Sequence, residues 1–187
     1  MLDFGCGTGL LTEKVQSQVS NAISIDVAPS MIKVLQEKTK SGGWDNVEAY
    51  CVVAAHVGQA APETKAALEA WKGKVDIVAF SSVLSFVPEG DLKATMKFLC
   101  HMLKPGTGML MHSDWPKGED QPDGFAKEKA LAMHGMGGLQ AKTTKTITMK
   151  TGGYDMPVFL GVATKTSLIN DSSSPSNRPN KGRNTVN

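Results

Sequence analysis

The chain begins Met1-Leu2-Asp3-Phe4-Gly5-Cys6-Gly7-Thr8-Gly9, a short apolar run that leads through an acid into three alternating glycines. The helical pattern Leu10, Leu11, Val15 and Val19 follows at once, so the segment predicts a strand, a tight turn and a helix whose apolar stripe faces a sheet. Glycine suits such a turn because it lacks a Cβ, so that the backbone can take positive φ and a ligand can press against the main chain. A glycine turn at the end of a parallel strand is typical of a nucleotide site.

The spacing of the glycines indicates which kind of nucleotide is expected. Asp26 ends the apolar stretch Ala22–Ile25, about twenty residues after the turn, which is the usual distance to a carboxylate that binds a ribose hydroxyl. A dinucleotide fingerprint needs a small residue where this chain has Leu10, because Gly9 comes one position early. Asp3 also disfavours a pyrophosphate, since a carboxylate beside the turn repels phosphate and suits an ammonium group. A nicotinamide-dependent oxidoreductase is therefore disfavoured.

The pattern Asp-x-Gly-x-Gly-x-Gly with a later ribose acid resembles motif I of the class I S-adenosylmethionine-dependent methyltransferases, and the chain looks most like their small-molecule group. The resemblance runs from Leu2 to about Lys165 and includes Leu103-Lys104-Pro105-Gly106. It implies S-adenosyl-L-methionine as the cofactor, with the methionine moiety against the glycine turn, its amino group held by the first acid and the ribose held by the second. The cofactor-binding residues that the resemblance implies are Asp3, Gly5, Cys6, Gly7, Asp26, Val27, Met31 and Phe80.

Strands and helices alternate through the first 111 residues. Strands are expected over Leu2–Phe4, Ala22–Asp26, Val47–Ala55, Val75–Phe80 and from Gly108 to Met111. Helices are expected from Gly9 to about Ser20, from about Ser30, over Pro62–Trp71 and through Leu92–Leu103. The helix that begins near Ser30 should have an inner stripe of Met31, Ile32, Val34 and Leu35. The strand at Val75–Phe80 is apolar enough to be buried on both faces, as in the centre of a parallel sheet. Five such strands specify a doubly wound, mostly parallel α/β sheet.

The polarity of the last two predicted strands fixes their places in the sheet. Lys142–Lys150 alternates threonine and lysine, as expected of an edge strand, whereas Met156–Ala163 is almost entirely apolar. The connection Thr151–Asp155 is too short for a crossover helix, so the pair should be an antiparallel hairpin. The seventh strand should therefore insert beside the fifth. The resulting order, 3-2-1-4-5-7-6 with an antiparallel seventh strand, is the Rossmann-like fold that the methyltransferase resemblance implies.

Length and composition limit the other functions. The 187 residues, 41% of them hydrophobic, suffice for one domain, expected over residues 1–169, while 170–187 should be a disordered polar tail. The net charge of +2 and the absence of a basic stripe argue against nucleic acid, and no apolar run suggests a membrane segment or secretory signal. Three unpaired cysteines predict neither a disulfide framework nor a metal site, which favours a cytoplasmic protein.

The chain departs from the methyltransferase pattern in two places. The third strand commonly ends in an acid that accepts a bond from the adenine amino group, but Tyr50–Ala55 contains none, so adenine should be held by backbone and apolar contacts. Ser85-Phe86 stands where relatives often have paired histidines, which rules out histidine catalysis there. No catalytic residue is identified. If the acceptor needs a base, His112 and Asp114 are candidates because alternation places them on one side of the fifth strand.

The leading interpretation is methyl transfer from S-adenosylmethionine to a small-molecule acceptor, without a metal. The alternative is a non-catalytic methyltransferase-like protein or fragment with weak or no cofactor binding, in which Asp26 serves only as an acid at a helix N-terminus. Only Leu2–Phe4 precede the turn, whereas a central strand normally has about 5 to 6 residues. We therefore expect a chain shortened at its N-terminus, lacking helices that cover the cofactor in relatives, with marginal stability.

Overall fold

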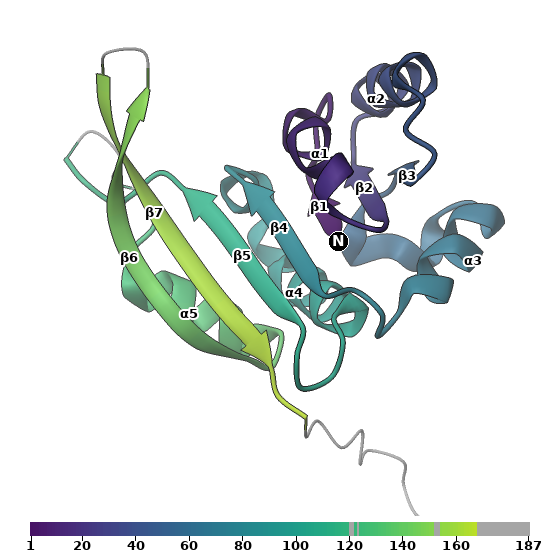
Figure 1. The fold of residues 1–187 in the computed structure, drawn as a ribbon. Helices are drawn as coiled ribbons and strands as arrows, with labels where there is room; N and C mark the ends of the chain where they lie inside the picture. The colour runs from purple at the N-terminus through teal and green to yellow at the C-terminus, as the bar shows by residue number, and fades with distance from the viewer. Residues whose placement is uncertain (120–121, 123, 152–153, 168–187) are drawn as a thin grey trace, which may run out of the picture.

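A computed structural model describes residues 1–119, 122, 124–151 and 154–167 and contains a seven-stranded sheet (Figure 1). The strand order β3-β2-β1-β4-β5-β7-β6 confirms the predicted topology. Strands β1 to β5 are parallel to one another, and β7 is antiparallel to both β5 and β6. The strands are β1 Leu2–Phe4, β2 Ala22–Asp26, β3 Val47–Cys51, β4 Ile77–Ser81, β5 Met109–Asp114, β6 Leu139–Thr151 and β7 Tyr154–Lys165.

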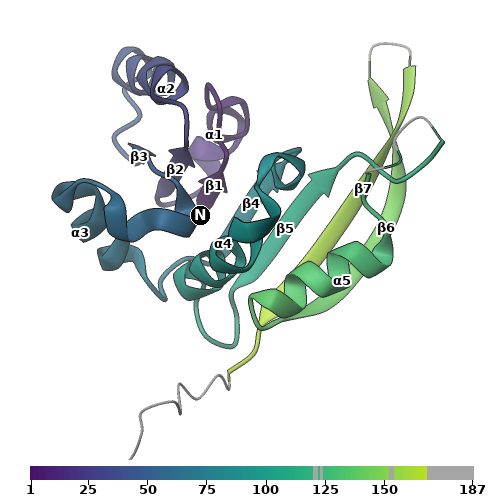
Figure 2. The same ribbon diagram turned by 180° about the vertical axis from the view of Figure 1, so that it is seen from behind.

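Helices connect the strands and cover the sheet. Figure 2 shows α4 and α5 lying across one face, with β5 and β7 behind them. The α-helices are α1 Leu10–Val15, α2 Pro29–Gly42, α3 Pro62–Trp71, α4 Glu89–Met102 and α5 Lys127–Met136, and the short 3-10 helices are η1 Gln16–Gln18, η2 Ala54–Gln59 and η3 Leu84–Phe86. The sequence analysis did not predict α5, whose buried residues Ala130, Met133 and His134 lack the branched apolar side chains that mark a helical stripe. No helix of the described residues is both long and apolar enough to span a membrane.

The central strand β1 is buried along its whole length between β2 and β4. Leu2 pairs with Ile23 on one side and with Val78 on the other, and none of the three is exposed. The ladder toward β2 starts one residue earlier, since the N–H of Ile23 donates to the carbonyl of Met1 at 2.9 Å. The strand is short, but its three residues link the two halves of the sheet and lead straight into the glycine turn.

The first helix differs from its prediction. Leu10 is 69% exposed, whereas Thr12 is fully buried, so the predicted apolar stripe is wrong. The Thr12 hydroxyl donates to Oδ2 of Asp3 at 2.6 Å and lies 2.7 Å from the hydroxyl of Ser24. Burying a carboxylate requires hydrogen-bond donors, and Thr12 supplies both its hydroxyl and its N–H to Asp3. The helix therefore turns a polar residue inward, and it continues past Val15 only as the 3-10 turn η1.

Two further predictions needed correction. In α2 the inner stripe consists of Ile32 and Leu35, while Met31 and Val34 are exposed. Strand β3 ends at Cys51 rather than at Ala55. Its partner strand β2 ends at Asp26, so the last bond between the two runs from the N–H of Val52 to the carbonyl of Asp26 at 2.9 Å, after which the chain bends into η2 along the edge of the cavity described below.

The hairpin of β6 and β7 confirms the expected edge and inner strands. Strand β7 pairs with β5 from Phe159 to Thr164 and with β6 along its whole length. Val158, Phe159 and Ala163 are buried, as the apolar composition of this strand predicted. The hairpin turn at residues 152–153 and the tail at 170–187 lie outside the described residues, so the domain boundary at 169 stays a prediction.

Replacing Thr12 by valine should destabilise the fold. The substitution keeps the volume but removes the hydroxyl donor to Asp3, whose carboxylate is 2% exposed. Loss of one partner of a buried group costs about 1–3 kcal/mol, which urea unfolding would detect. Thr64→Val in α3 is the control, because Thr64 is only half-buried in a helix far from this network. Equal unfolding midpoints for the two variants would contradict the role given to Thr12.

Candidate functional site

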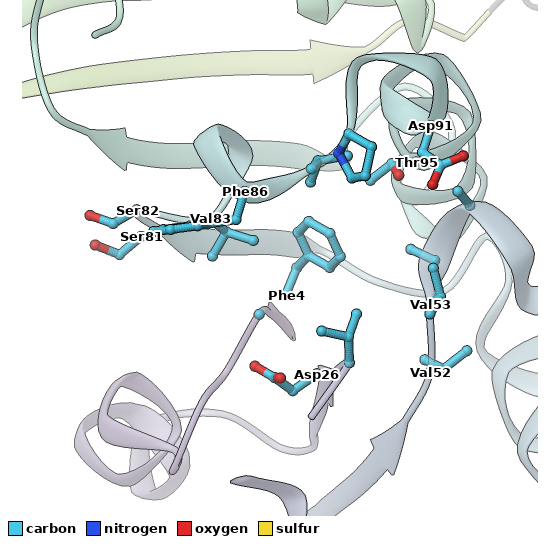
Figure 3. Close-up of a pocket in the computed structure, with 16 residues that line it drawn as sticks. Phe4, Asp26, Val52, Val53, Ser81, Ser82, Val83, Phe86, Asp91 and Thr95 are labelled. Atoms are coloured by element: carbon cyan, nitrogen blue, oxygen red, sulfur yellow. The ribbon is translucent and has the colours of Figure 1, made fainter. Parts of the chain in front are cut away.

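A cavity of about 300 Å³ opens at the carboxyl ends of β1, β2 and β4 (Figure 3). The segment after β3 and the first turns of α4 complete its wall, so five separate parts of the chain meet here. The lining residues are Phe4, Gly5, Asp26, Val27, Val52, Val53, Ala54, Ala55, Ser81, Ser82, Val83, Phe86, Val87, Pro88, Asp91 and Thr95. Small and apolar side chains predominate, and two acids stand among them, a composition suited to a flat heterocycle joined to a polar group.

The glycine turn is held against the end of β2 by its own backbone. The N–H groups of Gly5 and Cys6 both donate to the carbonyl of Ile25, at 2.8 and 3.1 Å. Gly5 must be glycine, because its φ is 66° and a Cβ would lie 2.5 Å from a methyl group of Val83. Gly7 also has a positive φ, 54°, but no atom lies within 4 Å of the place where its Cβ would stand. The space beside Gly7 is therefore open for a ligand.

Asp26 connects this turn to the cavity. One carboxylate oxygen accepts the N–H of Gly7 at 2.8 Å, and the other accepts the N–H of Ala28 at 2.9 Å. Each oxygen of an ionised carboxylate has two lone-pair sites, so both can still accept a hydroxyl group. A pair of oxygens fixed side by side at the rim of a cavity is suited to a ribose diol. The predicted coupling between the glycine turn and Asp26 is thus a direct hydrogen bond.

Asp3 and Cys6 lie behind the glycine turn rather than in the cavity wall. The Asp3 carboxylate is bonded to Thr12, and burial raises its pKa above the ordinary value although those bonds lower it. The Cys6 thiol packs with Ile32 and Leu35 of α2, and burial raises the pKa of this thiol as well. Their side chains therefore support the turn, and contact with the amino group of a ligand by Asp3 stays a prediction.

The other three predicted binding residues fall in different places. Val27 lines the cavity and is 62% exposed, whereas Met31 lies on the outer part of α2 and is not among the lining residues. Phe80 is turned into the core, where its ring stacks on His112 with centroids 5.3 Å apart and meets Phe4 edge-on. Alternation along β4 then places the next residue, Ser81, in the wall in place of Phe80.

The turn after β4 contributes a strained residue that the sequence analysis did not single out. Ser82 has a φ of 55°, the one non-glycine residue with positive φ in the described part of the chain. Its N–H donates to the carbonyl of Ser113 at 2.7 Å, which holds the turn against the end of β5. Strain of this kind costs on the order of 1–3 kcal/mol and persists where the surroundings fix the backbone. Here it directs Val83 against Gly5, and both residues line the cavity.

Comparison with known proteins agrees with this geometry. A family model described as a methyltransferase domain matches residues 2–109, which include the glycine turn, Asp26 and β4. The chain belongs to the methyltransferase-domain family. The family and fold predicted from the glycine turn are thereby confirmed, and the match covers the parts of the chain that form the cavity wall.

The chain is also similar to individual proteins. It is 32% identical over 107 residues to a ubiquinone biosynthesis O-methyltransferase of Xylella fastidiosa (strain 9a5c), covering 57% of this chain and 38% of that protein. The matched region thus spans little more than a third of this relative's length. The fold resembles a SAM-dependent methyltransferase of Methanosarcina mazei (TM-score 0.69, 15% identity, 88% of this chain and 91% of that one). It also resembles the N-methyltransferase NodS of Bradyrhizobium japonicum WM9, solved with S-adenosyl-L-homocysteine (TM-score 0.62, 18% identity, 88% and 76% covered).

The two candidate bases of the methyltransferase domain lie together in the core. As alternation along β5 predicted, His112 and Asp114 share one side, and Nδ1 of His112 lies 2.7 Å from Oδ2 of Asp114. His134 of α5 approaches from the other direction, with its Nε2 3.2 Å from Nε2 of His112. His134 is buried, with 1% of its surface exposed, and it belongs to α5, a helix that the sequence pattern does not predict. Neither His112 nor Asp114 lines the cavity.

The environment of His134 disfavours its protonated form. Burial first, and the neighbouring His112 second, lower the pKa of His134 to about 4. Its Nδ1 is buried without a hydrogen-bond partner among the described residues, and the same is true of Oδ1 of Asp114. Burial therefore keeps the His134 imidazole neutral, and its neighbour His112 lies against the rings of Phe125 and Phe159.

Acid should destabilise the domain through His134. Because its folded pKa is below the unfolded value of about 6.5, the unfolded chain binds a proton that the folded chain does not between about pH 6.5 and about 4. The contribution to stability is present above this range and is lost as the pH falls through it, by up to about 3 kcal/mol. Urea unfolding at several pH values should show a weaker pH dependence for His134→Gln. The exposed helical His101, changed to Gln, is the control and should leave the slope unchanged.

Replacing Gly7 by valine should abolish binding of S-adenosylhomocysteine, since the side chain would enter the open space beside the turn. Gly43→Val is a matched control, because Gly43 has a similar φ of 64° and equally open surroundings at the end of α2. Both variants carry the same backbone strain, but only the first should lose affinity in calorimetric titration. Normal binding by Gly7→Val would refute the proximity of the turn to the ligand.

Proposed function

We propose that this domain binds S-adenosyl-L-methionine in the cavity and catalyses methyl transfer to a small-molecule acceptor. The observation that carries the proposal is the carboxylate of Asp26, held by the N–H groups of Gly7 and Ala28 at the cavity rim. Its two oxygens would accept the ribose hydroxyls, with the glycine turn next to them. The relative from Xylella fastidiosa, an O-methyltransferase of ubiquinone biosynthesis, supports a small acceptor.

The charge of the cavity wall fits this cofactor better than a dinucleotide. The described lining residues include Asp26 and Asp91 but no lysine, arginine or histidine. A pyrophosphate would meet two carboxylates without a cation to balance it, whereas a ligand with an ammonium group and a sulfonium ion carries positive charge. The apolar side chains of Val52 and Val53 offer a surface for an adenine ring.

The residues of the domain act by holding the reactants in position. The bound cofactor supplies a methyl carbon that its sulfonium has already activated, so the protein contributes mainly alignment and exclusion of water. Asp26 and the glycine turn would fix one end of the ligand, and Val83 of the strained turn packs against Gly5 in the same part of the wall. Phe86, which is 82% exposed at the mouth of the cavity, provides apolar surface next to the site where an acceptor would enter.

The proposal also includes the location of the protein and the chemical class of its acceptor. The three free cysteines support a reducing, cytoplasmic location, because thiols persist where disulfides are not formed. The net charge of +2 supports an acceptor other than nucleic acid. The alternative, a non-catalytic protein that binds the cofactor weakly, is favoured by the lack of an acid at the end of β3, where Val52–Ala55 form the wall.

Calorimetric titration with S-adenosylhomocysteine tests the proposal. We expect micromolar binding, and Asp26→Ala should weaken it by about 1.5–3 kcal/mol, the scale of hydrogen bonds to a charged group. Asp45→Ala, at an exposed turn after α2, is the control and should bind normally. Absence of binding by the unaltered chain would support the non-catalytic alternative. Binding of NADH instead would support an oxidoreductase and refute the proposal.

A further inference from the structure

The cavity wall contains a second carboxylate, Asp91, which the glycine turn does not explain. Asp91 lies in the first turn of α4, and Thr95, one helical turn later, lines the cavity beside it. Residues four apart lie on the same face of a helix, so α4 presents this face to the cavity as a unit. The Asp91 side chain is 29% exposed, which leaves it accessible from the cavity while much of it is packed.

A histidine from a different element adjoins this carboxylate. Nε2 of His56, in η2, lies 3.1 Å from Oδ1 of Asp91. The segment η2 follows directly on the part of the wall at Val53 and Ala54, and it packs along α4. His56 is the one ion-pair partner of Asp91 in the described part of the chain, and it contacts only one of the two carboxylate oxygens. The second oxygen is therefore left to interact with another group.

The position of Asp91 within the cavity indicates which part of a ligand it would meet. In Figure 3 Asp91 and Thr95 descend from α4 above Val53, away from Ser81 and Ser82 at the end of β4. The glycine turn and Asp26 bind the amino-acid and ribose parts of the ligand according to the proposed function. The remaining length of the cavity, between Val53 and Asp91, is the space left for the base.

We propose that Asp91 accepts a hydrogen bond from the exocyclic amino group of the adenine ring and so selects a 6-aminopurine. This inference rests on the proposed function and names the residue that recognises the base. The usual acid at the end of β3 is missing, and Asp91 supplies a carboxylate to the same end of the cavity from the other side. His56 acts as a positioning residue, because its contact with Oδ1 restrains the carboxylate.

An experiment can distinguish recognition of the base by Asp91 from a simpler role in stabilising α4. An acid in the first turn of a helix is stabilised by the helix dipole whether or not it binds a ligand. Glu89 stands in the same first turn of α4 but is not among the cavity-lining residues. Glu89→Gln is therefore matched to Asp91→Asn, because both substitutions remove one charge from the same helix end.

The test compares two ligands that differ at one position of the purine. S-Adenosylhomocysteine carries an amino group, a hydrogen-bond donor, where S-inosylhomocysteine carries a carbonyl oxygen, which a carboxylate repels. We expect the unaltered chain to bind the adenosyl compound about 10 to 100 times more tightly, the range of a hydrogen bond to a charged group. Asp91→Asn should bring this ratio close to one, because the amide can donate to the carbonyl oxygen. Glu89→Gln should keep the original ratio.

The outcomes distinguish this inference from the proposed function. Binding of the adenosyl compound with an unchanged ratio in Asp91→Asn would overturn the role of Asp91 while leaving the function in place. Failure of the unaltered chain to bind either compound would overturn the proposed function, and this inference with it. Equal loss of the ratio in both variants would show an effect of the helix end and would also overturn the inference. Circular dichroism melting of each variant confirms that the ratio is measured on folded protein.

Discussion

Three hydrogen bonds, on which the site depends, join the turn after β1 to the end of β2. Gly5 and Cys6 donate to Ile25, and Gly7 donates to one oxygen of Asp26, whose other oxygen accepts the N–H of Ala28. The bonds are possible because the glycine backbone turns at positive φ, which brings three successive N–H groups toward the neighbouring strand. The same bonds close the turn, orient the Asp26 carboxylate and leave the space beside Gly7 open.

A buried polar layer beneath the turn complements this constraint. Asp3, Thr12 and Ser24 form a chain of hydrogen bonds in which each residue is 2% exposed or less. Such a network is favourable only when every member has a partner, because an unpaired polar group in an apolar surround is costly. The helix α1 therefore gives up an apolar contact at position 12 and exposes Leu10 instead. The helix thus departs from hydrophobic periodicity at the position where a polar side chain supports the glycine turn.

The domain contains two clusters of titratable groups, one in the core and one at the cavity. His112, Asp114 and His134 are enclosed by aromatic rings in the core, where burial keeps His134 neutral. Asp91 and His56 meet at the cavity, where solvent and a ligand can reach them. Burial of His134 makes the stability of the fold depend on pH, whereas Asp91 forms part of the cavity wall. Separation of the two allows the fold and the binding site to be altered independently.

The sequence by itself determined the glycine turn, the acid at position 26 and the order of the last two strands. These features are local, since glycine spacing, the distance along the chain to Asp26 and the polarity of each strand are properties of short segments. Only the tertiary structure decided that Thr12 and His134 are buried, that Phe80 faces the core, and that Asp91 completes the cavity wall. These outcomes depend on how elements from distant parts of the chain cross and pack. A single segment cannot encode them, because its periodicity describes one face and not the neighbour that will cover it.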